Sequence, residues 1–292
     1  MIAVRLIGGL GNQMFQFACG RALAARMHTP VCFDLSAFDS YQPHRYGLDG
    51  FRGEIVKAPW HMTTGSRFCA VARRLHFSSA LYFKLRGIYW VHENGDLRYQ
   101  PERLIFEGPA YLDGYWQCSR YFDDFEQCLR EDFRLTEPLA EVLQNRREVL
   151  GCGVGATVSV HVRRGDYVTN PAAHATHGTL GEDYYRRAVE RMAARLGRDF
   201  RLLVFSDDIA WAREHLRLPG ESVHVQANER FPQVDMHLMA SCDHHIIANS
   251  SFSWWGAWLN PCESKTVIAP ASWFRSAALR DNDICPPDWV RL

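Results

Sequence analysis

Residues 158–167 have the sequence VSVHVRRGDY, in which a strand-like run is followed directly by two arginines, a glycine and an aspartate. The run TVSVHV at 157–162 is apolar at alternate positions and predicts a buried β-strand. In open α/β sheets, ligands bind beyond the carboxyl ends of the strands. Arg163, Arg164 and Asp166 therefore mark a first candidate site, with ordinary surface charge as the alternative.

The sequence on the carboxyl side of this strand alternates between helix and strand patterns, which predicts a doubly wound parallel sheet. The predicted strands are 157–162, 201–208, 222–227, 244–251 and 265–270, and the predicted helices are 182–196, 209–216, 233–242 and 252–260. The glycine-rich stretch GCGVGAT at 151–157 indicates a boundary. We therefore predict one domain at 1–153 and a second at 154–292.

The amino-terminal end begins a second parallel α/β domain. A strand at 2–7 is followed by the turn GGLGN at 8–12, a helix at 13–28 and a strand at 30–35. This order is a β-turn-α-β unit. Residues 36–100 have no clear periodicity and are not assigned.

The composition excludes several classes of protein. Of 292 residues, 33 are Lys or Arg and 33 are Asp or Glu, so no net field favours nucleic acid. The nine cysteines form no C-x-x-C pair, which predicts buried free thiols and a cytoplasmic location. No apolar run is long enough for a membrane span, and the amino terminus lacks a signal-peptide pattern.

Two further strand ends carry polar groups. Each pattern has a structural alternative, because Asp-Asp after a strand and serines before a helix are common helix caps. Together with the arginines they predict a nucleotide diphosphate site, since guanidinium forks and helix N-termini bind phosphate oxygens. The two sets are Ser206, Asp207 and Asp208 after the strand at 201–208, and Asn249, Ser250, Ser251 and Ser253 before the helix at 252–260.

Three rival sites are weaker. Gly9-x-Gly11 followed by Asp34 mimics a dinucleotide-binding fingerprint, which would indicate an NAD or FAD oxidoreductase, but Met14 stands at the third glycine position. The sequence DND at 281–283 has the letters of a metal-binding Asp-x-Asp, yet it does not follow a buried strand. The histidines in CDHH at 242–245 would alternate across a strand, so they are a poor metal site. We predict no metal ligands.

The segment 57–86 is basic and aromatic, and no acidic residue lies between Glu54 and Glu93. It is either a solvated helical face or a surface for anionic lipid or an anionic acceptor. The aromatic loop at 110–125 has the same ambiguity, because such side chains serve both cores and sugar sites. The cations of the basic segment are Lys57, Arg67, Arg73, Arg74, Lys84 and Arg86.

The chain resembles the bacterial α-1,2-fucosyltransferases of glycosyltransferase family 11. The resemblance rests on GGLGNQMFQFA (8–18), GYWQCSRYF (114–122), HVRRGDY (161–167), FSDD (205–208) and IIANSSFSWWGAWLN (246–260). It implies a GT-B arrangement, in which two Rossmann-like domains face a cleft. The domain at 154–292 would bind GDP-β-L-fucose, and the domain at 1–153 would contribute most of the acceptor site.

The implied reaction is an inverting transfer of fucose to the 2-hydroxyl of a terminal β-galactoside, without an obligatory metal. The acceptor would be an oligosaccharide or a lipid-linked surface glycan. A peripheral contact with the inner face of the cytoplasmic membrane is an alternative that the basic segment leaves open. Neither the acceptor glycan nor the oligomeric state is predicted.

The resemblance also implies roles for single residues. Arg163 would stabilise the β-phosphate, and Asn12 would face the donor sugar and the acceptor. Arg164 would share the diphosphate or point back into the fold, and Asp166 would orient the arginines. Either Asp207 or Asp208 would contact guanosine, and His161 would line the cleft or the core. The remaining predicted donor contacts are Gly11, Ser206, Asn249, Ser250, Ser251, Phe252 and Ser253.

An inverting transfer needs a base near the acceptor hydroxyl. His28, Asp34, His44 and Asp113 are candidates in the first domain, and none is favoured by its spacing. Trp254, Trp255 and Trp258 recur at helical spacing and are predicted to pack in the core.

Overall fold

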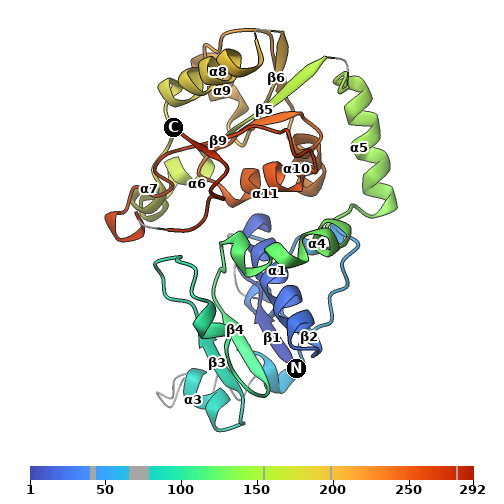
Figure 1. Cartoon of the computed structure of the whole chain (residues 1–292), viewed down its shortest axis with the longest axis vertical. Coiled ribbons are helices and arrows are strands. Elements are labelled where there is room, and N and C mark those ends of the chain that lie inside the picture. The colour runs from blue at the N-terminus through green and yellow to red at the C-terminus, as the bar shows by residue number, and fades with distance from the viewer. Residues whose placement is uncertain (40–43, 66–78, 154, 198, 281) are drawn as a thin grey trace. The chain divides into compact units, whose positions relative to one another are not determined.

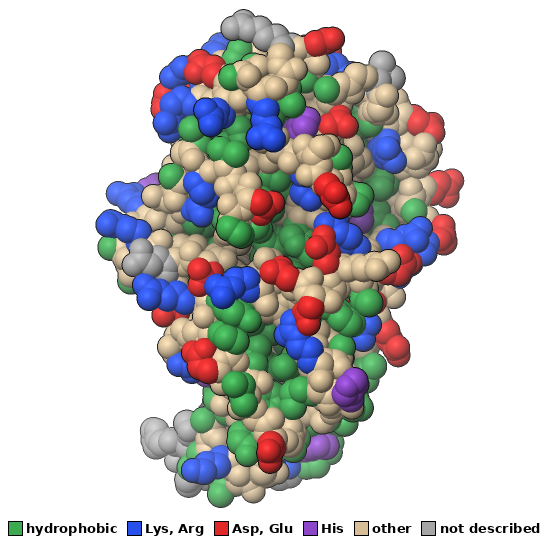
Figure 2. Space-filling view, viewed as in Figure 1, with side chains coloured by type: hydrophobic (Ala, Val, Ile, Leu, Met, Phe, Trp, Pro, Cys, Tyr) green, Lys and Arg blue, Asp and Glu red, His purple; other side chains and the backbone are tan. Residues whose placement is uncertain are grey.

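A computed structural model describes residues 1–39, 44–65, 79–153, 155–197, 199–280 and 282–292. It divides into two compact units (Figure 1). Unit 1 comprises Met1–Arg134 with Asp281–Ile284, and unit 2 comprises Leu135–Arg280 with Cys285–Leu292. Lys, Arg, Asp and Glu side chains are interspersed on the face shown in Figure 2, as expected from the balanced composition. No described helix is both long and apolar enough to cross a bilayer.

Unit 1 contains a four-stranded parallel sheet with the order β2-β1-β4-β3. Helix α1 packs against one face of this sheet, where a Cβ on Gly20 would lie 2.5 Å from Val4. Helix α3 covers the other face through Tyr82 and Phe83. The elements are β1 (Ile2–Arg5), α1 (Leu10–Arg26), β2 (Val31–Asp34), α3 (Ser79–Lys84), β3 (Tyr89–His92), β4 (Ala110–Asp113) and α4 (Glu126–Asp132).

Unit 2 contains a six-stranded parallel sheet with the order β10-β9-β8-β5-β6-β7. The elements are α5 (Glu137–Val149), β5 (Ala156–Val162), α6 (Gly165–Thr169), α7 (Pro171–His177), α8 (Glu182–Leu196), β6 (Phe200–Ser206), α9 (Ile209–His215), β7 (Ser222–Val225), α10 (Pro232–Ala240), β8 (His244–Ile246), α11 (Ser251–Leu259), β9 (Val267–Ala269) and β10 (Val290–Arg291).

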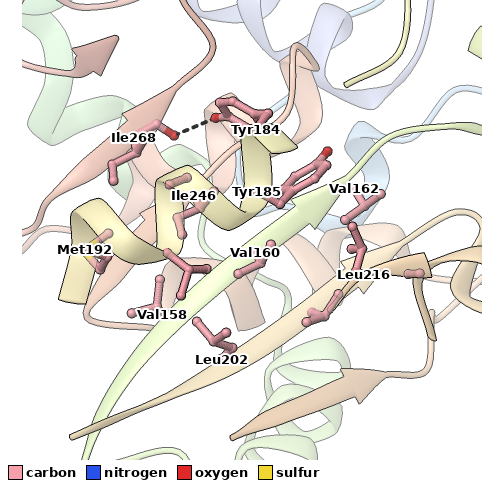
Figure 3. Close-up of a cluster of buried hydrophobic side chains, with 14 of the residues drawn as sticks. Val158, Val160, Val162, Tyr184, Tyr185, Met192, Leu202, Leu216, Ile246 and Ile268 are labelled. Atoms are coloured by element: carbon pink, nitrogen blue, oxygen red, sulfur yellow. Dashed lines mark hydrogen bonds between the residues drawn. The ribbon is translucent and has the colours of Figure 1, made fainter. Parts of the chain in front are cut away.

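Both faces of the unit 2 sheet are buried, which explains why its strands read as continuous apolar runs. Val158, Val160 and Val162 pack with α8 on one face (Figure 3). Tyr184 of α8 donates its hydroxyl to the carbonyls of Ile247 at 2.7 Å and Ile268 at 3.3 Å. On the other face, Leu203 and Phe205 of β6 pack with Leu238 and Met239 of α10, and Figure 1 shows α10 beside the sheet.

The predicted fold class, α/β with parallel Rossmann-like sheets, is confirmed in both units. Several local predictions differ. Helix α1 begins at Leu10, so Gly11 and Asn12 lie in its first turn and not in a loop before it. Helices α6 and α7 were not predicted, because two short helices of five and seven residues have too little periodicity to detect.

The division between units also differs from the boundary that we predicted at 153/154. Helix α5 belongs to unit 2, where Leu143 packs against the core under α10 and Arg146 pairs with Asp235. Gly151, Gly153 and Gly155 have positive φ values of 60°, 93° and 74°. The glycine-rich stretch is therefore a turn between α5 and β5 inside one unit, and not a linker between units.

The eight cysteines among the described residues are free thiols. Cys19, Cys32, Cys118 and Cys242 are buried, as predicted. Cys128 and Cys262 are exposed, so burial is not general. Cys69 lies outside the described residues.

The histidine pair of CDHH is used for hydrogen bonds within unit 2. His245 is fully buried, with Nδ1 2.8 Å from Ser159 Oγ and Nε2 2.8 Å from Asn260 Nδ2. Because the Asn260 amide nitrogen can only donate, Nε2 accepts and Nδ1 carries the proton. His244 Nδ1 accepts the Thr266 amide at 3.0 Å. Burial lowers the pKa of His245 to about 3, and nearby Lys265 adds to this effect.

We predict that unit 2 loses stability as the pH falls from about 7.5 to about 5.5, because the unfolded chain protonates His245 and the folded chain does not. The stabilisation is complete above the ordinary pKa of 6.5 and declines toward a pH of about 3. One such histidine costs about 1.4 kcal/mol over this interval. Urea unfolding at both pH values measures the change.

The His245→Asn variant should show a pH-dependent loss smaller by about 1.4 kcal/mol. The matched control is His92→Asn, at an exposed histidine of unit 1, which should retain the wild-type pH dependence. An undiminished pH dependence in the His245 variant would contradict the neutral buried state.

Candidate active site

The three predicted groups of polar residues lie at one edge of the unit 2 sheet. Strands β8, β5 and β6 are neighbours and run parallel, so their carboxyl ends meet at the same edge. Arg163 follows β5, Asp207 follows β6, and Asn249 follows β8. The structure therefore brings together groups that are far apart in the sequence. Arg163 and Asn249, for example, are separated by more than 80 residues.

Arg163 lies between two carboxylates. Its Nη1 is 2.9 Å from Asp207 Oδ2, and its Nη2 donates to Asp166 Oδ1 at 2.7 Å. The guanidinium carbon also lies 5.3 Å from the centre of the Tyr167 ring. Burial opposes the charge of Arg163, but Asp207 and Asp166 outweigh it and raise the pKa. Arg163 is thus a fixed, charged group whose side chain is about a quarter exposed.

Arg164 packs back against helix α9. Its guanidinium lies 3.9 Å above the Trp211 ring, and its Nε is 3.2 Å from Asp208 Oδ2. Asp208 also caps α9 by accepting the Trp211 amide at 3.1 Å, and its own amide donates to Ser206 Oγ at 2.9 Å. Of the two roles left open for Arg164, the geometry favours the one inside the fold.

Asp207 binds the turn that follows β5. Its Oδ1 accepts the backbone amide of Arg164 at 2.8 Å, while Oδ2 pairs with Arg163. A Cβ on Gly165 would lie 2.5 Å from Asp207 Oδ2. The glycine in the RRGD sequence is therefore required for this close approach. Both Asp207 oxygens are bonded to the arginine turn, whereas the sequence had suggested a guanosine contact for Asp207 or Asp208.

His161 is buried on the sheet face opposite α8, with its ring 5.7 Å from the ring of Phe252. Its Nδ1 has no hydrogen-bond partner among the described residues. Burial, together with the charge of Arg163, lowers the pKa of His161 to about 3. The imidazole is therefore neutral and retains hydrogen-bonding capacity next to the arginine turn.

The polar residues around the start of α11 divide into two groups. Asn249 donates to the carbonyls of His177 at 3.0 Å and Trp273 at 3.1 Å, and its Oδ1 has no partner among the described residues. Ser253 is fully buried and donates to backbone carbonyls of the turn, so it stabilises the helix start. Ser250 and Ser251 lie at the N-terminus of α11, the positive end of the helix dipole, and the Ser250 amide donates to the Ala248 carbonyl at 2.8 Å.

Tryptophan packing in α11 is confirmed. Trp254 and Trp255 are fully buried, and Trp258 is nearly so. Their rings contact one another with centroids 5.0 to 6.2 Å apart.

Asn12 lies at the carboxyl edge of the unit 1 sheet, between β1 and β4. Its Oδ1 accepts Gln117 Nε2 at 2.7 Å, which links the turn after β1 to the turn after β4. Ligands of open α/β sheets bind where the strand order reverses, and in this sheet that point lies between β1 and β4. Gly11 is buried in the same helix turn.

Two buried glutamines of α1 hold these turns and were missed from the sequence. Gln16 accepts the Ile7 amide at 2.9 Å and donates to the Gly114 carbonyl at 3.1 Å. Gln13 donates to the Gly8 and Arg45 carbonyls, each at 2.9 Å. The sequence feature that could have indicated them is a pair of glutamines three residues apart in an otherwise apolar helix.

Glu93 was also missed, because it lies in the stretch without periodicity. It is only 6% exposed and accepts the backbone amides of Tyr115 at 2.6 Å and Trp116 at 3.0 Å. Burial raises the pKa of Glu93, although these two amides oppose the rise. Trp116 has a φ of +55°, and a non-glycine residue in this region is often part of a functional loop.

Asp34 cannot take the role that a dinucleotide enzyme would give it. It is 1% exposed, and its carboxylate accepts hydrogen bonds from Ser36, Thr64 and Tyr111 at 2.6 to 3.0 Å. The same bonds make Asp34 unavailable as a base. At the carboxyl end of the chain, Asp283 accepts the Tyr99 amide at 2.8 Å and is part of the unit 1 fold.

The other base candidates differ in position. His28 follows the C-terminal end of α1, so it lies at the opposite edge of the unit 1 sheet. The ring of His44 approaches a Cβ built on Gly9 to 3.6 Å, which places it beside the turn after β1. Asp113 ends β4 and pairs with Arg5 at 3.0 Å. His44 and Asp113 therefore remain candidates for the base near the acceptor hydroxyl.

Comparisons with known proteins identify the family. The model of "Glycosyl transferase family 11" matches residues 92–292. The chain is 32% identical to an alpha-1,2-colitosyltransferase of Escherichia coli, across all of this chain and 99% of the relative. It is 26% identical to the mouse galactoside 2-alpha-L-fucosyltransferase Sec1, across all of this chain and 74% of the relative.

Solved structures support the fold. Arabidopsis thaliana FUT1, as a mutant in complex with GDP, matches 91% of this chain and 69% of that one, with a TM-score of 0.59 and 14% identity. The fucosyltransferase NodZ from Bradyrhizobium matches 89% of this chain and 93% of that one, with a TM-score of 0.52 and 14% identity. The chain therefore belongs to glycosyltransferase family 11 and is a glycosyltransferase.

Proposed function

We propose that this glycosyltransferase transfers fucose from GDP-β-L-fucose to the 2-hydroxyl of a β-galactoside, with inversion and without an obligatory metal. The observation that carries the proposal is Arg163, a charged guanidinium fixed at the carboxyl end of β5 in a family 11 chain. Relatives named as α-1,2-fucosyl and α-1,2-colitosyl transferases support the linkage. The GDP in the FUT1 complex supports the donor class.

The chemistry requires stabilisation of the leaving group. The acceptor oxygen forms a bond to C1 of the sugar while the bond from C1 to the β-phosphate oxygen breaks. Negative charge therefore develops on the β-phosphate of GDP, and a preorganised cation stabilises this charge. We assign that role to Arg163. The acceptor proton leaves to a base in unit 1, for which His44 and Asp113 remain the candidates.

The other predicted residues have supporting roles in this proposal. The N-terminus of α11, at Ser250 and Ser251, attracts the phosphate oxygens through the helix dipole, and neutral His161 offers a hydrogen-bonding nitrogen near Arg163. Asn12 orients the acceptor from the first turn of α1. Asn249 and Ser253 act indirectly. Asn249 donates to the carbonyls of His177 and Trp273, and Ser253 donates to those of Ala248 and Ser250.

GDP-colitose is a second candidate for the donor substrate, since the E. coli colitosyltransferase is 32% identical over the whole chain. Colitose is fucose without its 3-hydroxyl. A site built to hydrogen-bond a hydroxyl rejects the analogue that lacks it by a factor of about 10⁴–10⁵. Comparing kcat/KM for GDP-fucose and GDP-colitose therefore separates the two donors.

The experiment that tests the proposal is transfer from GDP-fucose to lactose in the presence of EDTA, with the product linkage determined by NMR. We expect a 2-linked fucosyl product in which the new bond is α. Activity that appears only after a divalent cation is added would contradict metal independence. A protein that binds neither GDP nor GDP-fucose would contradict the donor assignment, whereas binding without transfer would contradict only lactose as an acceptor.

We predict that Arg163→Ala lowers kcat by a factor of about 100 to 1,000, or about 2.7–4 kcal/mol, because the charge on leaving GDP loses its preorganised partner. Single-turnover transfer measures the effect. Arg186→Ala is the control, because Arg186 of α8 pairs with Asp183 and Glu190 at the surface. Wild-type turnover in a folded Arg163 variant would exclude the phosphate role.

We also propose that the enzyme is cytoplasmic and that unit 1 makes a peripheral contact with anionic lipid. In the basic segment, Arg67, Arg73 and Arg74 lie outside the described residues. The Arg86 guanidinium lies 5.3 Å from the centre of the Trp60 ring, and Trp60 and Leu85 are 58% and 77% exposed. Exposed apolar groups beside cations suit an anionic interface, although a solvated helical face is the alternative.

This surface predicts binding to phosphatidylglycerol vesicles that weakens as salt increases. The doubly substituted variant Trp60→Ala/Arg86→Ala should reduce sedimentation with these vesicles severalfold. Vesicles of phosphatidylcholine alone are the control. Equal sedimentation with both kinds of vesicle, or none at low salt, would favour the solvated face.

A further inference from the structure

The groups around Arg163 have an unexpected balance of charge. Two guanidinium groups, Arg163 and Arg164, contact three carboxylates, those of Asp166, Asp207 and Asp208. This cluster therefore has a formal charge of −1. A nucleoside diphosphate adds at least two further negative charges. Diphosphate binding to the cluster in this arrangement is opposed by its own carboxylates.

The two carboxylates on Arg163 are held very differently. Asp207 is bonded through both oxygens, to the Arg164 amide at 2.8 Å and to Arg163 Nη1 at 2.9 Å, and Gly165 packs against it. Its side chain is 27% exposed. The Asp166 side chain is 42% exposed, and it forms an ion pair with Arg163 Nη2 at 2.7 Å. Asp166 is therefore the easier of the two to displace.

The geometry of a guanidinium indicates which carboxylate a phosphate meets. A phosphate can bind Arg bidentately either through Nε and Nη2 or through Nη1 and Nη2. Both modes use Nη2, which is the nitrogen that Asp166 holds. Asp207 holds Nη1, and only one of the two modes involves that atom.

We propose that the two aspartates have opposite effects on the donor. Asp207 is a positioning residue that fixes Arg163 and the turn after β5. Asp166 is an exchangeable counter-ion that gives up Nη2 to the diphosphate and takes it back when GDP leaves. The inference rests on the proposed binding of GDP-fucose by unit 2, and it names the residue that limits how tightly the product is held.

The test compares Asp166→Asn with Asp207→Asn by calorimetric titration with GDP and by steady-state transfer. Removing the competing charge in Asp166→Asn should tighten GDP binding on the order of tenfold, lower KM for GDP-fucose and strengthen product inhibition by GDP. This gain should shrink as salt increases. Loss of the positioning contact in Asp207→Asn should weaken GDP binding and lower kcat.

Asp183→Asn is the matched control, because Asp183 also pairs with two arginines of unit 2, Arg186 and Arg187, but on the surface of α8. Its affinity for GDP should equal that of the wild type. Gly165→Ala is a second probe of Asp207, since the added Cβ would lie 2.5 Å from its carboxylate. This variant should reproduce the weakened GDP binding while Asp166 is intact.

The signs of the changes decide the outcome. Weaker GDP binding in Asp166→Asn would show that Asp166 orients Arg163, and unchanged binding would show that its charge does not compete with GDP. Either result would overturn the counter-ion role. Wild-type GDP binding in both Asp207→Asn and Gly165→Ala would overturn the positioning role. Failure of the wild-type protein to bind GDP would overturn the proposed donor, together with this inference.

Discussion

The bond between the Asp207 carboxylate and the Arg164 amide determines how unit 2 presents its arginines. Strands β5 and β6 are parallel neighbours, so a side chain one residue beyond β6 reaches the turn after β5. That single contact fixes the direction in which the chain leaves β5. It also explains Gly165, which leaves room for the carboxylate. The Asp207–Arg164 bond and the space at Gly165 together determine the position of Arg163.

Unit 1 uses the same construction. Glu93 lies one residue beyond β3 and accepts the amides of Tyr115 and Trp116 in the turn after the neighbouring strand β4. Here too a glycine makes the approach possible, because a Cβ on Gly114 would lie 2.4 Å from Glu93 Cβ. In each unit, a carboxylate after one strand therefore stabilises the turn after its neighbour. Glu93, which is buried, is costly to remove, because its loss would leave backbone amides unsatisfied.

The sequence alone was sufficient for the parts of the chain with strong periodicity. It located helix α8 at 182–196 and the three strand ends that meet at the edge of the unit 2 sheet. It could not assign Gln16 or Glu93, whose partners lie 98 and 22 residues away, because such bonds exist only after the sheet has formed. For the same reason the sequence suggested a guanosine contact for Asp207 or Asp208 and did not indicate that both Asp207 oxygens bind the arginine turn.

Binding strength and turnover make opposite demands on a glycosyltransferase. A cation that binds the ground state of the donor as tightly as its transition state gains nothing in rate, and it also retains the nucleotide product. Without counter-ions, Arg163 and Arg164 would bind the donor and the nucleotide product tightly in this way. In the proposed donor site, the carboxylates beside them would keep ground-state binding moderate, while the full negative charge of the departing phosphate would still meet a fixed guanidinium. The three carboxylates of this turn are therefore compatible with the proposed role of Arg163 in catalysis.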